Sequence, residues 1–307
     1  MKALVYKSTG SWYTVKDEAG KWYQARTKGV LKLDDITSTN PVAVGDWVEM
    51  ETESTQETAV ISEIHERNNY INRQSPRHKH QHHIVAANLD QSVLVATLRE
   101  PRTSQGFIDR FLVASEMYHV PALLVFNKVD LYREKDFDKF AEWEEMYSAI
   151  GYKVLLVSTV TGQGIGELKE LLLNKTSLIS GHSGVGKSSM LNVIFPDKNL
   201  KTQGVSGWSG KGQHTTTFAE MYDLPEGGRI IDTPGMREFG LVDVEKQEVS
   251  HYFPEMRERL SGCQFNNCQH LNEPGCAIKE AVAEGEINMD RYLSYVSIVE
   301  TLEDKGY

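Results

Sequence analysis

GHSGVGKS, residues 181–188, is the stretch that decides how this chain folds. The pattern G-x-x-x-x-G-K-S is typical of loops that wrap the phosphates of a bound nucleotide. Residues 176–180 predict a short buried strand before the loop. Residues 187–194 predict a helix after it, because Met190, Leu191 and Ile194 recur at helical spacing. This order directs backbone N–H groups and the positive end of the helix dipole at phosphates. A glycine turn that arose by chance is the alternative interpretation.

The loop residues have defined roles if the ligand is a nucleoside triphosphate. The Lys187 ammonium group would reach the β- and γ-phosphates, and the Ser188 hydroxyl would bind Mg²⁺. The string by itself does not distinguish ATP from GTP. We expect phosphate contacts from Gly181, His182, Ser183, Gly184, Val185, Gly186, Lys187, Ser188 and Ser189.

A second motif, NKVD at residues 127–130, precedes the phosphate loop. It matches N-K-x-D, which reads guanine in Ras-like GTPases, where it normally follows the loop. A threonine run at residues 215–217 and DTPG at residues 232–235 come after the loop, and D-x-x-G is the segment that closes on the γ-phosphate. The parts of a Ras-like GTPase site are therefore present in a permuted order. This order indicates a circular permutation, which compact domains tolerate because their termini usually lie close together at the surface.

The segments after the loop suggest how the γ-phosphate and the metal are bound. Gly235 would contact the γ-phosphate. Position 236, where Ras-like enzymes place the Gln that orients the attacking water, is Met236, which cannot form that hydrogen bond. His214 is the best internal candidate for a catalytic group beside Thr216, although it could equally be a loop residue or an RNA contact. The expected Mg²⁺ ligands are Ser188, Thr216 and Asp232.

Asp130 predicts selectivity for guanine over adenine. Its carboxylate can accept from guanine N1–H and from the exocyclic amine, and sites built on such bonds reject analogues that lack them by up to ~10⁴–10⁵. Residues 122–126 predict a buried strand, which places the motif at a strand's carboxyl end, where α/β sheets bind ligands. After a strand at residues 153–157, STV resembles the S-A-x turn that supports the base. We expect guanine contacts from Asn127, Lys128, Asp130, Ser158, Thr159 and Val160.

Length and composition exclude several other classes. A chain of 307 residues suggests about two domains. No apolar run approaches the ~20 residues of a membrane span, and residues 1–6 predict a strand rather than a signal peptide. The net charge of −10 confines any nucleic-acid-binding surface to local basic segments. Residues 67–89 and 198–219 lack acidic side chains and could provide such surfaces or be solvated loops.

The chain divides into three predicted regions. Residues 1–75 alternate apolar and polar side chains in short runs, which predicts a small β-barrel that fits an OB-fold. Residues 76–245 alternate strands with helices, as a mostly parallel sheet requires. Residues 246–307 are expected to be helical. The predicted fold is therefore α/β, a circularly permuted Ras-like P-loop GTPase domain between an N-terminal OB-fold β-barrel and a C-terminal helical zinc-binding subdomain. Its helices are expected at residues 105–119, 137–150 and 164–175.

All three cysteines lie in one loop of the C-terminal region, in the pattern C-x₄-C-x-H-x₅-C. Three thiolates and one imidazole make a closed tetrahedral set for a structural Zn²⁺, which leaves no open position for catalysis. A disulfide would leave one thiol unpaired, and disulfides are rare in the cytosol. Three free thiols and a surface histidine are the alternative. The predicted ligands, for one zinc ion per chain, are Cys263, Cys268, His270 and Cys276.

These features together resemble the RsgA family, also called YjeQ or YloQ, of GTPases that depend on the small ribosomal subunit. The resemblance covers nearly the whole chain, and residues 181–189 and 212–217 are particularly similar to family strings. It implies a cytoplasmic, monomeric GTP hydrolase that binds the immature small ribosomal subunit and its rRNA late in assembly and leaves after hydrolysis. The net acidity departs from what a strong rRNA binder would have.

Two classes of function stay open at this level. The first is a GTPase whose slow turnover is accelerated by the small subunit. The second is a GTP-sensing, RNA-binding checkpoint module in which the bound nucleotide sets affinity and catalysis matters little. A permuted GTPase that serves the large subunit is less favoured, because the barrel and the zinc loop are the wrong accessories for it.

Overall fold

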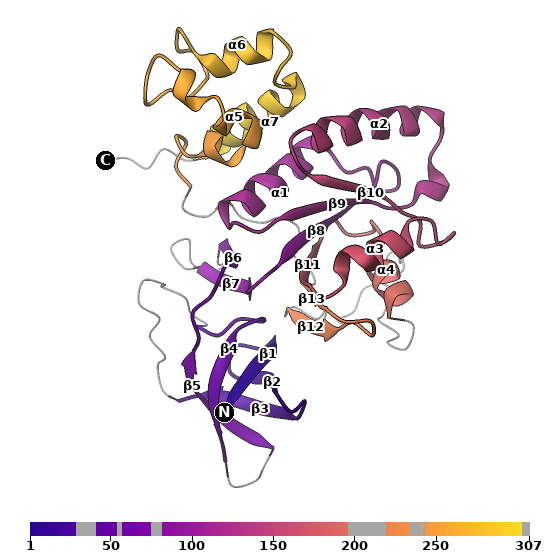
Figure 1. Ribbon diagram of the computed structural model, residues 1–307, viewed down its shortest axis with the longest axis vertical. Helices are drawn as coiled ribbons and strands as arrows, with labels where there is room; N and C mark the ends of the chain where they lie inside the picture. The colour runs from indigo at the N-terminus through magenta and orange to yellow at the C-terminus, as the bar shows by residue number, and fades with distance from the viewer. Residues whose placement is uncertain are drawn as a thin grey trace, which may run out of the picture.

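A computed structural model describes residues 1–28, 41–53, 57–74, 82–195, 219–233, 241 and 244–302. In this part of the chain, eleven strands form one continuous sheet, ordered β10-β9-β8-β11-β13-β12-β1-β2-β3-β5-β4. Figure 1 shows that one end of the sheet curls into a barrel, whereas the other end is open and flanked by helices. This arrangement confirms the predicted α/β fold with an N-terminal barrel.

The barrel consists of five short strands, and all but the first alternate buried and more exposed residues over part of their length. β4 pairs back with β1 and so closes the barrel, and β3 and β5 are the one parallel pair among the five. Small and branched side chains such as Val5, Val15 and Ile61 fill the interior. The strands correspond to the predicted apolar runs: β1 (Lys2–Ser8), β2 (Tyr13–Asp17), β3 (Trp22–Thr27), β4 (Trp47–Thr52) and β5 (Thr58–Ile64).

The open part of the sheet is mostly parallel and has helices on both faces. Only β12 runs antiparallel to its neighbour β13. Its strands are β8 (Gln91–Ala96), β9 (Ala122–Phe126), β10 (Lys153–Leu156), β11 (Thr176–Ser180), β12 (Glu220–Asp223) and β13 (Arg229–Asp232). The helices are α1 (Gln105–Met117), α2 (Glu134–Ala149), α3 (Ile165–Leu172) and α4 (Lys187–Ile194), with a short 3-10 helix, η1 (Val129–Leu131).

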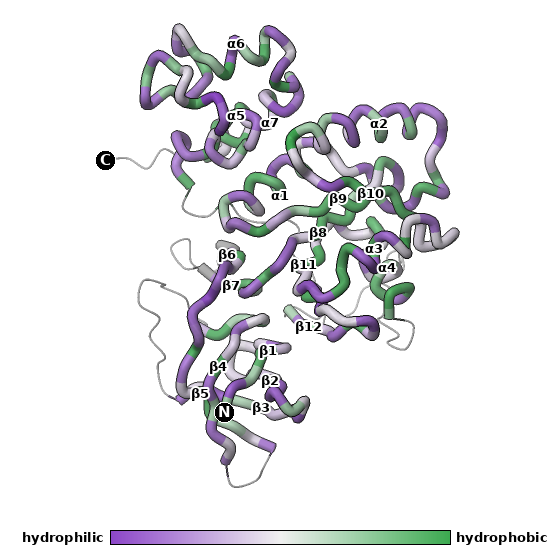
Figure 2. The backbone as a smooth tube through the Cα atoms, viewed as in Figure 1, coloured by the Kyte–Doolittle hydropathy of each residue, from purple (hydrophilic) through white to green (hydrophobic). Residues whose placement is uncertain are grey.

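Each face of this sheet has its own apolar core. Residues of α1 and α2 pack in one cluster with β8 and β9, and residues of α3 and α4 pack in a second cluster with the opposite side chains of the same strands. Figure 2 shows the result as an apolar trace along β9 and a mostly polar trace along the outer side of α2. The sheet is thus buried on both faces, as a parallel sheet requires.

Two helices end differently from the sequence prediction, for local reasons. α2 begins at Glu134 rather than residue 137, because the Asp136 carboxylate accepts a hydrogen bond from the Arg133 backbone N–H at 2.9 Å and so caps an earlier turn. α3 ends at Leu172 rather than residue 175, because Asn174 has a φ of +57°, which a helix cannot contain.

The barrel joins the open sheet through β1 and β12, which pair at Lys7 and Glu220. The Lys7 ammonium lies 3.1 Å from the Glu220 carboxylate. The Tyr6 hydroxyl donates to Asp223 at 2.5 Å, and Lys16 Nζ lies 2.7 Å from the same carboxylate. The chain then passes from β5 to β8 through a separate hairpin of β6 (Tyr70–Gln74) and β7 (His82–Ala87).

The C-terminal region is built from short helices that pack against α1. They are η2 (Val249–Tyr252), α5 (Pro254–Arg257), η3 (Leu260–Gly262), α6 (Ala277–Ala283) and α7 (Met289–Thr301). Their apolar side chains form a third core that also includes Val113 of α1. Among the described residues, the structure has no helix with both the length and the apolar character to cross a membrane.

Candidate functional site

The GHSGVGKS loop connects β11 to α4 and is held tightly by two neighbouring segments. Gly181 has a φ of +142°, and a Cβ atom there would lie 2.2 Å from the Val95 carbonyl oxygen of β8. Gly186 has a φ of +95°, and a Cβ atom there would lie 2.3 Å from the Asn127 side chain. Only glycine fits these two positions, so the glycines set how closely the loop approaches the adjacent strand ends.

Lys187 folds back across this loop. Its ammonium group donates to the Gly181 carbonyl at 2.6 Å and to the His182 carbonyl at 2.7 Å. Burial lowers the pKa of Lys187, and the nearby Asp232 carboxylate opposes that shift. Burial likewise raises the pKa of Asp232, and Lys187 opposes it. The two side chains are therefore close enough to interact electrostatically, as a lysine and a metal-binding carboxylate at one phosphate site would be.

The remaining residues of the phosphate loop differ in how far they are exposed to solvent. Val185 is buried beneath the loop, and Ser183 and Gly184 are exposed at its crest. Ser188 and Ser189 lie half-buried in the first turn of α4. The loop is therefore closed toward the sheet and open toward solvent, which leaves its outer face available to a ligand.

Asn127 connects the NKVD motif directly to the phosphate loop. Its side-chain amide donates to the Val185 carbonyl at 2.9 Å in a fully buried position. The next residue, Lys128, has a φ of +66°, and its ammonium group donates to the Glu100 carbonyl in the loop after β8. Three strand ends, those of β8, β9 and β11, thus meet at one place although they are far apart in the chain.

Asp130 and the turn after β10 form the second half of this edge. The Ser158 hydroxyl donates to the Asp130 carboxylate at 2.5 Å and accepts from the Val160 backbone N–H at 3.2 Å. Ser158 is buried, Thr159 is half-buried, and Val160 is 79% exposed. The structure therefore brings the two predicted guanine segments together at the carboxyl ends of β9 and β10.

Several predicted site residues lie outside the described residues. They are His214, Thr216, Gly235 and the neighbouring Met236. Most of the acid-free segment at residues 198–219 and part of that at residues 67–89 also lie outside. The site that the structure describes therefore contains the phosphate loop, Asp232 and the guanine segments.

The four predicted zinc ligands lie together in the C-terminal region. Their ligand atoms are all within 4.8 Å of one another. His270 Nδ1 lies 3.6 Å from the Cys263 sulfur and 3.4 Å from the Cys276 sulfur. A tetrahedral zinc with ordinary Zn–S and Zn–N bonds would hold nitrogen and sulfur about 3.5 Å apart. The cluster therefore has the dimensions of a four-coordinate zinc site.

The surroundings of the cluster support the same assignment. Burial and the neighbouring thiols raise the pKa of Cys268 to about 12, so a bound cation would favour the thiolate form of this residue. The loop is fixed from outside by two α7 side chains, because the Tyr292 hydroxyl donates to the His270 carbonyl at 2.8 Å and the Tyr295 hydroxyl donates to the Gln269 carbonyl at 2.7 Å.

The sequence prediction missed several residues that shape the nucleotide edge. The buried Tyr132 hydroxyl accepts from the Leu98 backbone N–H at 3.2 Å and contacts the Asn127 carbonyl at 3.4 Å. Phe107 of α1 stacks on His182 of the phosphate loop, with ring centroids 3.6 Å apart. Of these residues, only Tyr132 could have been suspected from the sequence, because it lies two residues after the guanine motif. The contact of Phe107 with His182 depends on the tertiary structure, and no sequence pattern predicts it.

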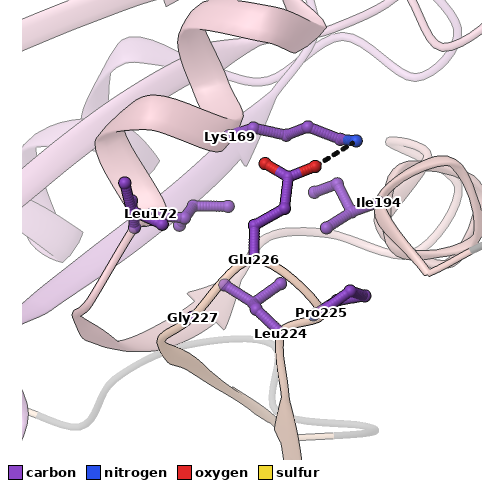
Figure 3. Close-up of a pocket in the computed structure, with 8 residues that line it drawn as sticks. Lys169, Leu172, Ile194, Leu224, Pro225, Glu226 and Gly227 are labelled. Atoms are coloured by element: carbon purple, nitrogen blue, oxygen red, sulfur yellow. Dashed lines mark hydrogen bonds and ion pairs between the residues drawn. The ribbon is translucent and has the colours of Figure 1, made fainter.

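A small apolar pocket lies at the opposite edge of the sheet. It is formed where α3 ends before β11 and where the β12–β13 turn leads into β13, that is, at the amino ends of these strands. Figure 3 shows Leu172 and Ile194 on its sides and the Lys169–Glu226 ion pair, 3.3 Å long, across it. Ligands of α/β sheets bind at the carboxyl ends of the strands, so we assign this pocket no part in the nucleotide site.

Comparison with known proteins gives one family over nearly the whole chain. A family model described as RsgA N-terminal domain matches residues 2–61, and another described as RsgA GTPase matches residues 64–242. The small ribosomal subunit biogenesis GTPase RsgA of Flavobacterium psychrophilum is 49% identical and aligns with 100% of this chain and 94% of its own. The protein of that name from Cytophaga hutchinsonii is 50% identical, over 97% and 98% of the two chains.

Two solved structures share the fold. The crystal structure of YjeQ from Thermotoga maritima superposes with a TM-score of 0.79 at 36% identity, and the match covers 97% of each chain. YloQ, described as a circularly permuted GTPase, superposes with a TM-score of 0.74 at 31% identity, over 100% of this chain and 96% of YloQ. The permutation inferred from the order of the motifs is thereby confirmed.

Proposed function

This chain belongs to the RsgA GTPase family and is a GTP hydrolase, and from that premise we propose that it acts in late maturation of the small ribosomal subunit. Relatives named for small ribosomal subunit biogenesis align with nearly its full length, which supports the same role here. The observation that carries the site assignment is the buried Asn127–Val185 hydrogen bond. It joins the guanine motif and the phosphate loop into one site although the permutation reverses their order.

In the proposed complex the nucleotide lies across the edge formed by β9, β10 and β11. Asp130 accepts from the guanine base, and the turn at residues 158–160 supports its plane. The backbone N–H groups of the phosphate loop surround the phosphates, since the loop opens toward solvent and the dipole of α4 points into it. Lys187 then exchanges the two loop carbonyls for phosphate oxygens, because a charged acceptor binds an ammonium group more strongly than a carbonyl does.

The residues around Lys187 fit a magnesium ion. Asp232 lies near Lys187, and Ser188 follows Lys187 in the first turn of α4, so a hydroxyl and a carboxylate oxygen, which Mg²⁺ prefers, are available on the same edge. We assign Ser188, Thr216 and Asp232 as the residues that would hold it. The ion would neutralise charge that develops on the phosphate oxygens. The Lys187 charge counteracts the burial that raises the pKa of Asp232, and the Asp232 charge counteracts the burial that lowers the pKa of Lys187.

The group that activates water is proposed from the sequence. Met236 occupies the position of the water-orienting Gln, so the free protein should turn over slowly. His214 is the proposed positioning or catalytic group, which contact with the ribosomal subunit would order. His214→Ala should lose most of the stimulated rate and keep its affinity for GTP. An unchanged stimulated rate would assign the group to the ribosome or to another part of the chain.

The C-terminal cluster is proposed to hold one structural zinc ion through Cys263, Cys268, His270 and Cys276. This proposal rests on the four ligand atoms lying within 4.8 Å of one another and on the distances of His270 Nδ1 to two of the sulfurs. We further propose three functional regions, residues 1–75, 76–245 and 246–307, and a monomeric cytoplasmic protein. The barrel and the C-terminal helices would contact rRNA through local basic surfaces, since the chain as a whole is acidic.

One comparison of rates tests the proposed function. GTP turnover is measured for the free protein, with purified small subunits, and with purified large subunits at equal concentration. Small subunits should accelerate turnover strongly, and large subunits should not. Equal stimulation by both subunits would overturn the proposal. GTP-dependent binding to small subunits without acceleration would support the alternative of a GTP-sensing RNA-binding checkpoint module, which the presence of Met236 favours.

A further inference from the structure

Helix α1 contacts the phosphate loop through one aromatic pair. The Phe107 ring stacks on the His182 imidazole, with centroids 3.6 Å apart and planes inclined by 30°. Phe107 is fixed at the start of the helix, where its backbone N–H donates to the Ser104 hydroxyl at 3.3 Å. The carbonyl of His182 is one of the two that accept from Lys187. The position of Phe107 is therefore linked, through one residue, to the lysine of the phosphate site.

The other side of α1 is fixed to the C-terminal region. Asp109 is fully buried, and its carboxylate accepts from Arg291 of α7 at 2.7 Å. Residues two apart lie about 200° apart around a helix axis, so Phe107 and Asp109 point to nearly opposite sides. Figure 1 shows α1 accordingly between the sheet that carries the phosphate loop and the helices α5 and α7.

The contact between α1 and the C-terminal region is a buried ion cluster. Arg291 is 1% exposed and also donates to both carboxylate oxygens of Glu255 in α5, at 2.8 and 3.2 Å. Its guanidinium lies over the Phe253 ring at 4.6 Å, and the Tyr147 hydroxyl of α2 donates to Asp109 at 2.8 Å. Such a cluster has few alternative geometries, because each shift would leave a buried charge without its partner.

We propose that Phe107 is a positioning residue for the phosphate loop and that α1 couples this loop to the C-terminal helices through Asp109 and Arg291. Stacking on His182 holds the loop in the conformation that presents Lys187 to phosphate. A nucleotide that orders the loop also restrains α1, and the ion cluster passes that restraint to α7. Coupling of this kind is reciprocal, so an ordered C-terminal region raises nucleotide affinity by the same factor. The inference deepens the proposed function, since it rests on the same nucleotide site.

The first experiment measures nucleotide affinity with a fluorescent GDP analogue. Phe107→Leu keeps an apolar side chain and removes the ring, and it should weaken binding about two- to tenfold, the range expected for one aromatic pair. Phe107→Tyr restores the ring and should restore affinity. Tyr118→Leu is the matched control, because Tyr118 is a half-buried aromatic residue at the C-terminal cap of the same helix and lies in a tilted contact with Tyr70, away from the phosphate loop.

The second experiment measures hydrogen exchange of the α7 amides with and without GDP, at concentrations that saturate each variant. GDP should slow exchange in the wild type and in Tyr118→Leu, and this slowing should be lost in Phe107→Leu. A merely structural role for Phe107 would change stability and leave the nucleotide-dependent difference intact, which would overturn the inference. Equal GDP affinity of Phe107→Leu and wild type would also overturn it. Failure of the wild type to bind GDP or GTP would instead remove the proposed function.

Discussion

The phosphate loop and the Cys–His loop share a dependence on positive backbone φ angles but differ in how exposed they are. Both depend on residues with positive φ, Gly181 and Gly186 in one and His270 and Gly275 in the other. The phosphate loop leaves its crest exposed and occupies its lysine with its own carbonyls. The Cys–His loop turns four ligand atoms inward, and His270 is only 2% exposed. The exposed phosphate loop can therefore bind and release its ligand, whereas the closed Cys–His loop would retain a bound metal ion.

The two loops also differ in what depends on them. The phosphate loop lies on a sheet with a core on each face, so its local geometry can change while the sheet persists. The C-terminal region has a single small core, in which Cys268 and Cys276 are themselves members. We therefore expect substitutions in the first loop to change binding, and substitutions in the second loop to change folding.

The largest effect should follow loss of the metal. Structural zinc contributes about 10–16 kcal/mol to folding in small zinc domains. Cys268→Ser, or treatment with a strong chelator, should therefore unfold the C-terminal helices, as limited proteolysis and circular dichroism would detect. Elemental analysis should find about one zinc per wild-type chain. Nucleotide binding should persist, weakened at most about tenfold through α1.

Ser261→Ala is the control for this change, because Ser261 lies in η3 two residues before Cys263 and provides no ligand atom to the cluster. A wild-type protein that contains no metal and is nevertheless fully folded would contradict the closed-loop interpretation.

Asp130→Asn tests the part of the nucleotide site that binds the base. The new amide has one acceptor oxygen instead of two and cannot accept from guanine N1–H and the exocyclic amine together, so GTP affinity should fall by up to ~10⁴-fold. Xanthosine triphosphate, whose C2 carbonyl accepts from the amide, should gain affinity. Titration of both nucleotides against both proteins checks this exchange, and thermal stability should remain near that of the wild type because Asp130 is exposed. Unchanged GTP affinity would remove Asp130 from the base site.

Lys187→Ala tests the phosphate loop itself. Hydrogen bonds to charged groups contribute about 1.5–3 kcal/mol each, so GTP and GDP affinity should fall by roughly two orders of magnitude. Lys169→Ala is the control, since Lys169 pairs with Glu226 at the opposite edge of the sheet. Isothermal titration should separate the two variants. A Lys187→Ala protein that bound GTP like the wild type would show that this loop does not hold the phosphates.

The smallest effect is expected for Tyr132→Phe. This change removes only the hydroxyl that contacts Leu98 and Asn127, so it should cost about 1 kcal/mol of unfolding free energy. Guanine nucleotides should bind a few-fold more weakly, because Asn127 loses part of its support. Urea denaturation and nucleotide titration measure the two changes, with Tyr70→Phe as the control. Equal stability and affinity in both variants would leave Tyr132 without a role at the site.

The sequence predicts those parts of the molecule that depend on local patterns. β9, β11 and α4 have the predicted bounds, because an apolar run or a helical repeat is interrupted by the glycines and polar residues of the site itself. The spacing of the cysteines and of His270 likewise predicts a cluster that the structure confirms. These features need only short-range information, and the guanine and phosphate motifs needed only their order in the chain.

The contacts that join the regions were not predictable in this way. Arg291 is one charged residue on a helix, and its partners Asp109 and Glu255 lie in two other segments. The pairing of Lys7 with Glu220 makes the barrel and the open sheet one structure, yet neither residue differs from an ordinary surface charge in sequence. Such contacts depend on how the elements pack in three dimensions, which the periodicity of the sequence does not predict.

The β1–β12 junction has a consequence for how the protein is made. Lys7 and Glu220 are 213 residues apart, so the contact is among the most non-local in the molecule. At 5–20 residues per second, about 10–40 s separate the synthesis of the two strands. β1 is already paired with β2 and β4, so the barrel can fold as soon as it leaves the ribosome. Until Asp223 is synthesised, Tyr6 and Lys16 lack this hydrogen-bond partner. The last strands of the nucleotide-binding sheet then pair with an edge strand of the barrel, which was synthesised first.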